Sequence, residues 1–191
     1  TEQTPREAQA YLCETWARIR AAMHRRGLQV YGFRVAEAHH DGTPHWHMLL
    51  FMNPVMVTKI RELMAAYAVK DSPEELGLVP MAMQIGGTYW AKIAPRFKAV
   101  PIDWSRGSAA GYIAKYIAKN IDGHGIEVDL EGRDAKDSAS RVDAWASCWG
   151  IRQFQQIGGA PVTVWRELRR LDAGQYDGVI GEAAAAADGA D

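Results

Sequence analysis

The sequence has few cysteines and lacks any long apolar run. Cys13 and Cys148 are the two cysteines among 191 residues, and their spacing matches no zinc-binding pattern. This argues against a disulfide framework. No stretch approaches about 18 uninterrupted apolar residues, so a transmembrane helix is not expected. The first residues, TEQTPREAQAYLCETW, lack the basic start and apolar core of a secretory signal. We therefore expect a cytoplasmic protein in a reducing compartment, with no membrane partner.

The composition is that of an ordinary globular protein. Hydrophobic residues make up 48% and charged residues 24%, which argues against disorder or a fibrous repeat. The length is close to that of one domain. Residues 172–191 are Ala-rich and acidic, without Lys or Arg, so we expect one domain over residues 1–171 followed by a flexible tail or linker. Because the chain begins with Thr1 rather than Met, we expect it to be part of a longer protein.

The net charge of −1 hides a local excess of basic residues. Five acidic residues after Leu171 account for more than this charge, so the rest of the chain carries a net charge of +4. Within residues 92–119, a single acid, Asp103, accompanies six basic residues: Lys92, Arg96, Lys98, Arg106, Lys115 and Lys119. Such a patch permits a nucleic-acid partner, although it also fits an ordinary solvated surface.

Hydrophobic periodicity and turn residues predict a mixture of helices and strands. The expected helices cover residues 5–26, 55–69, 107–120, 138–146 and 161–171. The expected strands cover residues 28–38, 45–52 and 151–157, and the strand-like stretch 81–104 has its clearest strand at 97–104. Helices that fall between antiparallel strands predict an α+β fold, with a central antiparallel sheet and flanking helices.

The first candidate site lies in the expected hairpin, where Asp41-Gly42 marks the turn. His45 and His47 flank Trp46, and residues two apart in a strand point to the same face. With Cα atoms about 6–7 Å apart, their imidazoles can close on one metal ion. A His-x-His pair by itself is a weak signal, since both residues also fit the end of an ordinary surface hairpin.

An acidic residue strengthens this metal-site hypothesis. With a three-residue turn at 41–43, Glu37 lies opposite His47, and His39 lies opposite His45. That face then carries two imidazoles and a carboxylate, with His39 as a spare ligand. Imidazoles favour zinc, iron or copper, whereas the carboxylate and the oxygens of a phosphate substrate favour magnesium or manganese. The ligand types alone do not choose among these ions.

The second candidate site lies on the helix expected over residues 107–120. Tyr112 and Tyr116 share one helix face, as do Lys115 and Lys119. A tyrosine hydroxyl has a reference pKa of about 10, so it needs a nearby cation to act as a nucleophile near neutral pH. The lysines can supply that charge or hold a phosphate. Packing of both tyrosines in an amphipathic helix is the alternative, but it explains the repeated Tyr-Ile-Ala-Lys less well.

Together the two sites resemble a known enzyme family. A His-hydrophobic-His motif followed by Tyr-x3-Tyr-x2-Lys is similar to the two-tyrosine HUH endonucleases, named for the two histidines around a hydrophobic residue. The resemblance is closer to the bacteriophage replication gene A protein family and spans roughly residues 28–170. It is carried by EAHHDGTPHWH at 37–47, GYIAKYIAKN at 111–120 and WGIRQF at 149–154. Members of that family are usually longer than this chain.

This resemblance implies an initiator of rolling-circle DNA replication with an HUH, RRM/ferredoxin-like fold. Such enzymes nick single-stranded DNA at a replication origin with Mg²⁺ or Mn²⁺. Carried over by position, His45, His47 and Glu37 are the metal ligands. The catalytic residues are Tyr112 and Tyr116 as nucleophiles, with Lys115 and Lys119 at the basic positions. One tyrosine forms a 5′-phosphotyrosine link and leaves a primer 3′-OH, and the second tyrosine can close the circle.

The sequence also suggests partners and DNA contacts. It contains no GxxxxGK[ST] phosphate-binding loop, so any helicase is a separate protein, expected from the host. Aromatic side chains near basic residues can stack on unpaired bases at about 1–3 kcal/mol per base. The candidate DNA-binding residues are Lys92, Arg96, Arg106, Trp149 and Arg152.

Three other functions remain open on the sequence alone. An HUH transposase or a plasmid relaxase-type enzyme would share the same chemistry. A zinc hydrolase or cupin-like oxygenase would also use a His pair, but a cupin motif usually has a Glu within a few residues, and residues 48–53 contain none. A non-catalytic module for single-stranded nucleic acid would use the basic and aromatic residues but leave the histidines and Glu37 without a role.

Overall fold

The computed structural model describes residues 3–78, 87–103, 105, 111, 135–159, 162–168 and 170. The chain divides into two compact units, Thr1–Ile157 and Gly158–Asp191. In the second unit the described helix is α6 (Val162–Leu168), which lies within the helix predicted at 161–171 but ends before the turn at Arg170. The tail predicted from residue 172 lies outside the described residues and stays a prediction.

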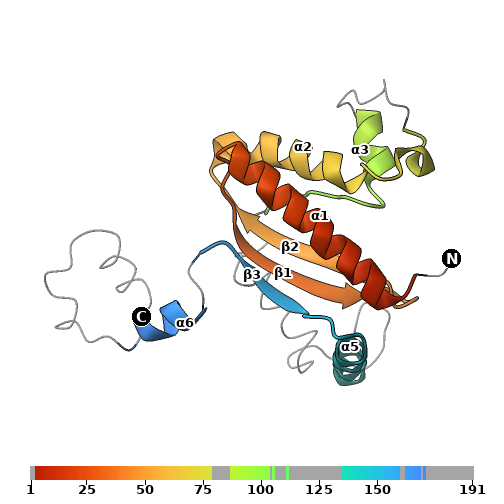
Figure 1. The fold of residues 1–191 in the computed structure, drawn as a ribbon, viewed down its shortest axis with the longest axis vertical. Helices are drawn as coiled ribbons and strands as arrows, with labels where there is room; N and C mark the ends of the chain where they lie inside the picture. Colours follow the sequence, from red (N-terminus) through yellow and green to blue (C-terminus); the bar gives the residue numbers. More distant parts are fainter. Residues whose placement is uncertain are drawn as a thin grey trace, which may run out of the picture. The chain divides into compact units, whose positions relative to one another are not determined.

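A three-stranded antiparallel sheet is the centre of the first unit (Figure 1). Its strands are β1 (Tyr31–Ala38), β2 (Pro44–Phe51) and β3 (Phe154–Ile157), in the order β2-β1-β3. The hairpin and the third strand predicted from the sequence are therefore confirmed. β1 is the central strand of the described sheet, because it pairs with β2 on one side and β3 on the other.

Helix α1 (Pro5–Arg25) lies across one face of this sheet (Figure 1). Thr4 caps its first turn: the Thr4 hydroxyl accepts a hydrogen bond from the Glu7 N–H, and the Glu7 carboxylate accepts one from the Thr4 N–H. This reciprocal cap satisfies donors that a helix start leaves unpaired. Ile19 and Met23 are buried on the inner side of α1, so the apolar stripe predicted over 5–26 is confirmed.

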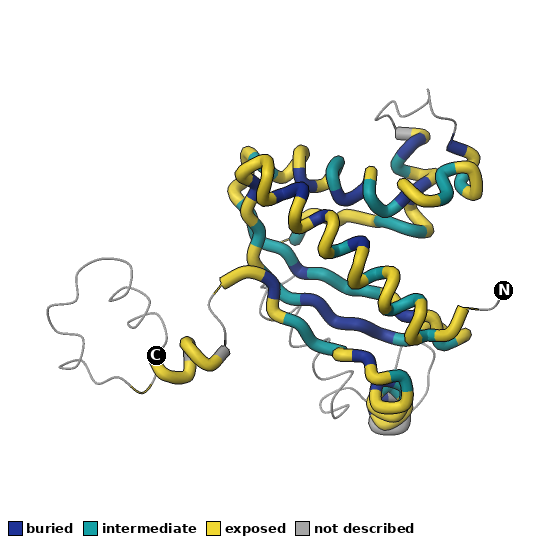
Figure 2. The backbone as a smooth tube through the Cα atoms, in the orientation of Figure 1, coloured by how far each residue is buried: buried dark blue, intermediate teal, exposed yellow. Residues whose placement is uncertain are grey.

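The main core lies between α1, the sheet and the next helix. After the short 3-10 turn η1 (Pro54–Met56), helix α2 (Val57–Ala68) contributes Ile60 and Met64 to the cluster around Ile19 and Met23. Partly buried Met48 and Leu50 of β2 pack against the same cluster. Figure 2 colours parts of α1, α2 and β1 as buried. This packing covers one face of the sheet with helices.

The region after α2 corrects the sequence prediction. The stretch 81–104 is predicted to be strand-like, but Gly87–Ile93 forms helix α3, and residues 97–103 contain no strand. Tyr89 and Ile93 are four residues apart and both are buried against Val69. That spacing matches one helix face, so packing against the end of α2 outweighs the β-like composition. Between the two helices lies the 3-10 turn η2 (Pro73–Leu76).

Helix α5 (Ala135–Trp149) leads into β3 and extends the helix predicted at 138–146 in both directions. Gly150 ends it with a positive φ of 64°, a conformation that glycine adopts without a side-chain clash. The architecture is α+β with a central antiparallel sheet and flanking helices, as predicted. None of the helices among the described residues combines the length and apolarity needed to cross a membrane.

Candidate metal and nucleic-acid site

The pleat of the sheet gathers the predicted metal ligands on one face. The indole N–H of Trp46 donates a hydrogen bond to Gln9 of α1, 2.9 Å away, so Trp46 points toward that helix. His45 and His47 flank Trp46 in β2 and therefore point to the opposite face. Glu37 of β1 shares that face because it pairs directly with His45. The face carrying these ligands is thus the one that α1 does not cover.

The predicted pairing register is wrong by two residues. Glu37 lies opposite His45, not His47, and the last pair of the hairpin is Ala38 with Pro44. The turn is longer than expected: the backbone N–H of His39 bonds to the carbonyl of Thr43 over 2.8 Å. A shift of two residues preserves the side-chain face, whereas a shift of one would reverse it. The grouping of the ligands therefore survives the error.

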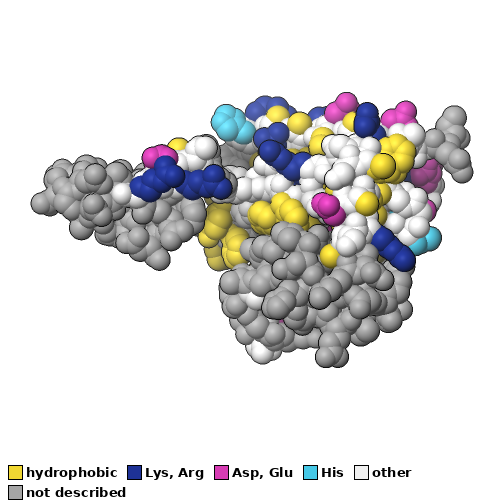
Figure 3. Space-filling model, turned by 90° about the horizontal axis from the view of Figure 1, so that it is seen from below, with side chains coloured by type: hydrophobic (Ala, Val, Ile, Leu, Met, Phe, Trp, Pro, Cys, Tyr) yellow, Lys and Arg dark blue, Asp and Glu magenta, His cyan; other side chains and the backbone are white. Residues whose placement is uncertain are grey.

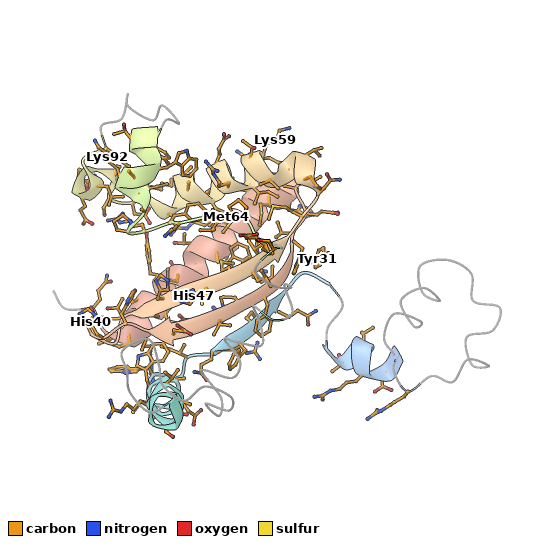
Figure 4. All side chains as sticks on the ribbon, turned by 180° about the vertical axis from the view of Figure 1, so that it is seen from behind. Tyr31, His40, His47, Lys59, Met64 and Lys92 are labelled. Atoms are coloured by element: carbon orange, nitrogen blue, oxygen red, sulfur yellow. The ribbon has the colours of Figure 1, made fainter. Side chains whose placement is uncertain are left out.

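A continuous chain of contacts joins the side chains of Glu37, His47, His45 and His39 (Figure 4 labels His47). Nε2 of His47 lies 3.3 Å from Oε2 of Glu37, and the rings of His45 and His47 are 4.7 Å apart between centroids. Nε2 of His39 lies 3.1 Å from Nδ1 of His45. Glu37 is buried at 8% relative exposure, while His45 is exposed. The buried carboxylate and the accessible imidazoles form one polar cluster.

The surroundings of His45 favour its neutral form. Partial removal of the ring from water lowers the pKa of His45, and electrostatic interaction with His47 and His39 lowers it further, while Glu37 opposes this lowering. A neutral imidazole retains the lone pair with which it binds a metal. The contact with His39 involves Nδ1 of His45, which leaves Nε2 as the nitrogen positioned for an outside ligand.

As they stand, these side chains do not form a coordination sphere. Among the described residues, no three His, Cys, Asp or Glu side chains are arranged to hold a metal ion. The reason is that their donor atoms contact one another: Glu37 engages His47, and His39 engages His45. The donor types themselves, imidazole nitrogens and a carboxylate, fit a divalent cation.

Two hydrogen bonds hold the turn beside the cluster. Asp41 accepts a hydrogen bond from the Thr43 N–H at 2.9 Å, and this bond lowers the pKa of Asp41. Gly42 has a φ of 83°, and its carbonyl accepts a 2.9 Å bond from the indole of Trp145 in α5. Helix α5 thus holds the turn from which the His45 strand begins. No local sequence pattern indicates this contact, since 103 residues separate the two partners.

A buried arginine lies under the site, on the α1 face of the sheet. Arg34 is only 4% exposed, and its guanidinium stacks over the ring of Trp46 at 4.1 Å. It also donates a 2.9 Å hydrogen bond to the carbonyl of Arg152, which ties β1 to the segment before β3. Burial lowers the pKa of Arg34, although a guanidinium stays charged near neutral pH. Sequence reasoning did not single out Arg34.

The predicted nucleophiles lie outside the described residues. This applies to Tyr112, Tyr116, Lys115 and Lys119, and also to Arg106 among the predicted DNA contacts. Their roles stay predictions. Gly111, directly before Tyr112, is helical.

The other predicted DNA-binding residues fall into two groups. Lys92 donates a 2.8 Å hydrogen bond to the carbonyl of Gly77, and Arg96 forms an ion pair with Glu75. These contacts join α3, and the segment that follows it in the chain, to η2. Trp149 is the last residue of α5, and Arg152 lies between α5 and β3. The Trp149 carbonyl accepts a 3.2 Å bond from Arg6, and the exposed Arg152 side chain bonds to Gln155.

Comparison with known proteins identifies relatives of this sequence. The family model for the bacteriophage replication gene A protein matches residues 1–124. The replication gene A protein of Escherichia phage 186 is 50% identical over 171 residues, which cover 88% of this chain and 23% of that protein. The corresponding protein of Escherichia phage P2 is 44% identical over 195 residues, covering 98% of this chain and 24% of that protein.

The name of a bacterial relative includes an enzymatic activity. A probable replication endonuclease from a prophage-like region of Salmonella typhimurium strain LT2 is 43% identical over 190 residues, covering 98% of this chain and 22% of that protein. The chain thus spans about a quarter of the length of the curated relatives it matches. No solved structure matches this chain.

Proposed function

Because the chain belongs to the bacteriophage replication gene A protein family, we propose that it carries the strand-nicking and strand-joining site of a replication endonuclease. Its substrate is single-stranded DNA at a replication origin. The observation that carries this proposal is the gathering of Glu37, His45 and His47 on one face of the sheet, within contact distance of one another. Relatives named replication endonucleases support the same reaction class.

Glu37, His45 and His47 are the residues that would hold Mg²⁺ or Mn²⁺. A divalent ion held there would supply positive charge that stabilises the charge on the scissile phosphate. The chain's own contribution is rigidity: Glu37 lies on the central strand, and β2 pairs with it along eight residues. His39 contacts Nδ1 of His45 and so orients the ring, as residues behind a metal ligand commonly do.

Tyr112 and Tyr116 are the proposed nucleophiles. The phenolate oxygen of one tyrosine attacks phosphorus, a new P–O bond forms, and the bond to the 3′ oxygen breaks. The leaving oxygen takes up a proton and becomes the free 3′-OH, while the 5′ phosphate stays on the tyrosine. Lys115 and Lys119 stabilise the phenolate and the phosphate charge. The tyrosyl ester keeps the energy of the broken bond, so rejoining needs no ATP.

The proposal also covers the partners of the reaction. Trp149, at the end of the helix that holds the hairpin turn, and Arg152, three residues later, are the proposed contacts to the DNA near the cut. Arg106, Lys92 and Arg96 are proposed as weaker contacts, the last two because their side chains already engage Gly77 and Glu75. A host helicase would separate the strands, and the reaction would take place in the cytoplasm.

Covalent capture of DNA tests the proposal. The chain is mixed with labelled single-stranded oligonucleotides and Mn²⁺, boiled in SDS and examined for labelled protein. We expect an adduct that EDTA abolishes and that the double variant Tyr112→Phe, Tyr116→Phe cannot form, because the variant lacks both hydroxyl nucleophiles. DNA binding by this variant should stay close to that of the parent chain.

A second variant separates the metal site from the fold. His47→Ala should remove metal-dependent cleavage while its circular dichroism spectrum and melting temperature stay near those of the parent chain. An adduct that persists in the tyrosine double variant would refute both nucleophiles. Unaltered nicking by His47→Ala would refute the metal site. DNA binding without any adduct, under all conditions, would favour the non-catalytic binding module.

A further inference from the structure

Two aromatic side chains form a stacked pair at the far end of the sheet from the hairpin turn. Tyr31 opens β1 and Phe51 closes β2, and the two are direct cross-strand partners. Their ring centroids are 5.2 Å apart, and the ring planes differ by 18°. Phe51 is half-buried, but Tyr31 is 59% exposed. Most of the Tyr31 surface is therefore exposed to solvent.

This aromatic pair faces the same side of the sheet as the histidines. Tyr31 lies six positions before Glu37 in β1, and Phe51 lies four positions after His47 in β2. Because both offsets are even, all four side chains point away from α1. Six residues of strand place Tyr31 about 20 Å from Glu37. Phe33 and Phe154 lie between them and pack with centroids 6.0 Å apart. Figure 4 shows Tyr31 at one end of the strands and His47 nearer their middle.

The last turn of α1, which precedes β1 in the chain, is basic. Arg34 is buried and Arg18 pairs with Asp71, so the exposed basic residues there are those at the end of the helix. His24, Arg25 and Arg26 end α1 and are exposed, and the chain reaches Tyr31 five residues later. Figure 1 places the end of α1 beside the start of β1. In Figure 3, hydrophobic side chains gather on the body near Lys, Arg and His side chains.

We infer that Tyr31, supported by Phe51, is a base-stacking subsite for single-stranded DNA, and that Arg25 contacts the adjoining phosphate. The inference rests on the proposed function, since it extends the DNA path from the histidine cluster along the same sheet face. Aromatic stacking supplies sequence-tolerant affinity, and arginines beside it supply the attraction to phosphate. A buried aromatic pair would need no such partner, but the exposure of Tyr31 leaves apolar ring surface in water.

The test measures binding without chemistry. Fluorescence anisotropy in EDTA compares a labelled oligothymidine of about 12 nucleotides with an abasic oligonucleotide that has the same number of phosphates. The parent chain should prefer the oligothymidine. In Tyr31→Ala this preference should fall about 5- to 100-fold, the range for the loss of one base–aromatic stack. Tyr31→Phe keeps the ring and should restore it.

Two further variants complete the experiment. Arg25→Gln should weaken binding of both oligonucleotides equally and lower the dependence on salt, because it removes a phosphate contact. Tyr11→Ala is the matched control: Tyr11 is an exposed tyrosine on α1, at 38% exposure, and its loss should change neither affinity. All variants are first checked for an unchanged melting temperature.

Three outcomes would overturn the inference. The first is a Tyr31→Ala chain that keeps the full preference for bases, and the second is a Tyr31→Phe chain that loses the preference as Tyr31→Ala does. The third is a Tyr31→Ala change that turns a dimer into a monomer without changing DNA affinity. That result would show that the sheet face carrying Tyr31 binds a second copy of the chain.

Failure of this inference is distinguishable from failure of the proposed function. A chain that forms the adduct but shows no base preference lacks only this subsite. A chain that shows the base preference but forms no adduct retains the subsite and refutes the nuclease.

Discussion

At the scale of single residues, the site depends on how each side chain meets its neighbour. Glu37 is the carboxylate of the cluster and is almost fully buried, so its position is set by the central strand. His39 is exposed and reaches the cluster through one ring nitrogen of His45. The two residues thus differ in kind: Glu37 can be a direct ligand, whereas His39 orients a ligand.

This difference predicts an order of effects on metal affinity. Glu37→Ala should weaken Mn²⁺ binding by more than about 100-fold because it removes a direct ligand, and His39→Ala by about 10-fold because it acts through His45. Isothermal titration calorimetry of the two variants measures both constants. The reverse order would mean that His39, not Glu37, is the third ligand.

At the scale of elements, the close packing of β1 against β2 explains why position 32 is occupied by glycine. Gly32 has a φ of 153°, and a Cβ placed on it would lie 2.0 Å from the backbone oxygen of Leu49. That atom belongs to the neighbouring strand and cannot move without breaking the ladder. Gly27, which follows α1, has a φ of 62°, but a Cβ placed on it would meet no atom within 4 Å.

These two glycines give a matched pair of variants. Gly32→Ala should lower the free energy of unfolding by more than about 3 kcal/mol, because β1 would have to move away from β2 to make room for the methyl group. Gly27→Ala should cost about 1 kcal/mol, the strain of a left-handed conformation alone. Urea denaturation measures both. Equal losses would show that the hairpin can absorb the added methyl group.

At the scale of the whole molecule, charge is distributed unevenly along the chain. The five acidic residues after Leu171 oppose a body with a net charge of +4. Charges separated by more than about 10 Å are largely screened near 0.1 M salt. An acidic tail is therefore expected to affect encounter with DNA mainly at low ionic strength.

Deletion of residues 172–191 tests this expectation. The shortened chain should associate with single-stranded DNA a few-fold faster at about 0.01 M salt, and the difference should vanish near 0.15 M. Stopped-flow anisotropy measures the association rate. Its melting temperature should match that of the parent chain if the tail is a linker. A lower melting temperature would show instead that the tail packs on the body.

Much of the fold and the first site could be predicted from local signals. Pro5 and the apolar stripe predicted α1, and strand-like runs on either side of Asp41-Gly42 predicted the hairpin. The helix at 87–93 could not be predicted, because Tyr89 and Ile93 are helical only through burial against α2. The contacts of Lys92 and Arg96 with other parts of the protein could not be predicted either, because their partners lie in another element.

The sequence by itself determined which side chains share the site face. His45, His47 and Glu37 are grouped by the two-residue period of a strand, which is a property of the backbone and tolerates a register error of two. Tertiary structure decided which face α1 covers, how α5 holds the turn through Trp145, and that Arg34 is buried beneath the cluster. Those features depend on contacts between residues distant in sequence, where packing and burial rather than local propensity set the outcome.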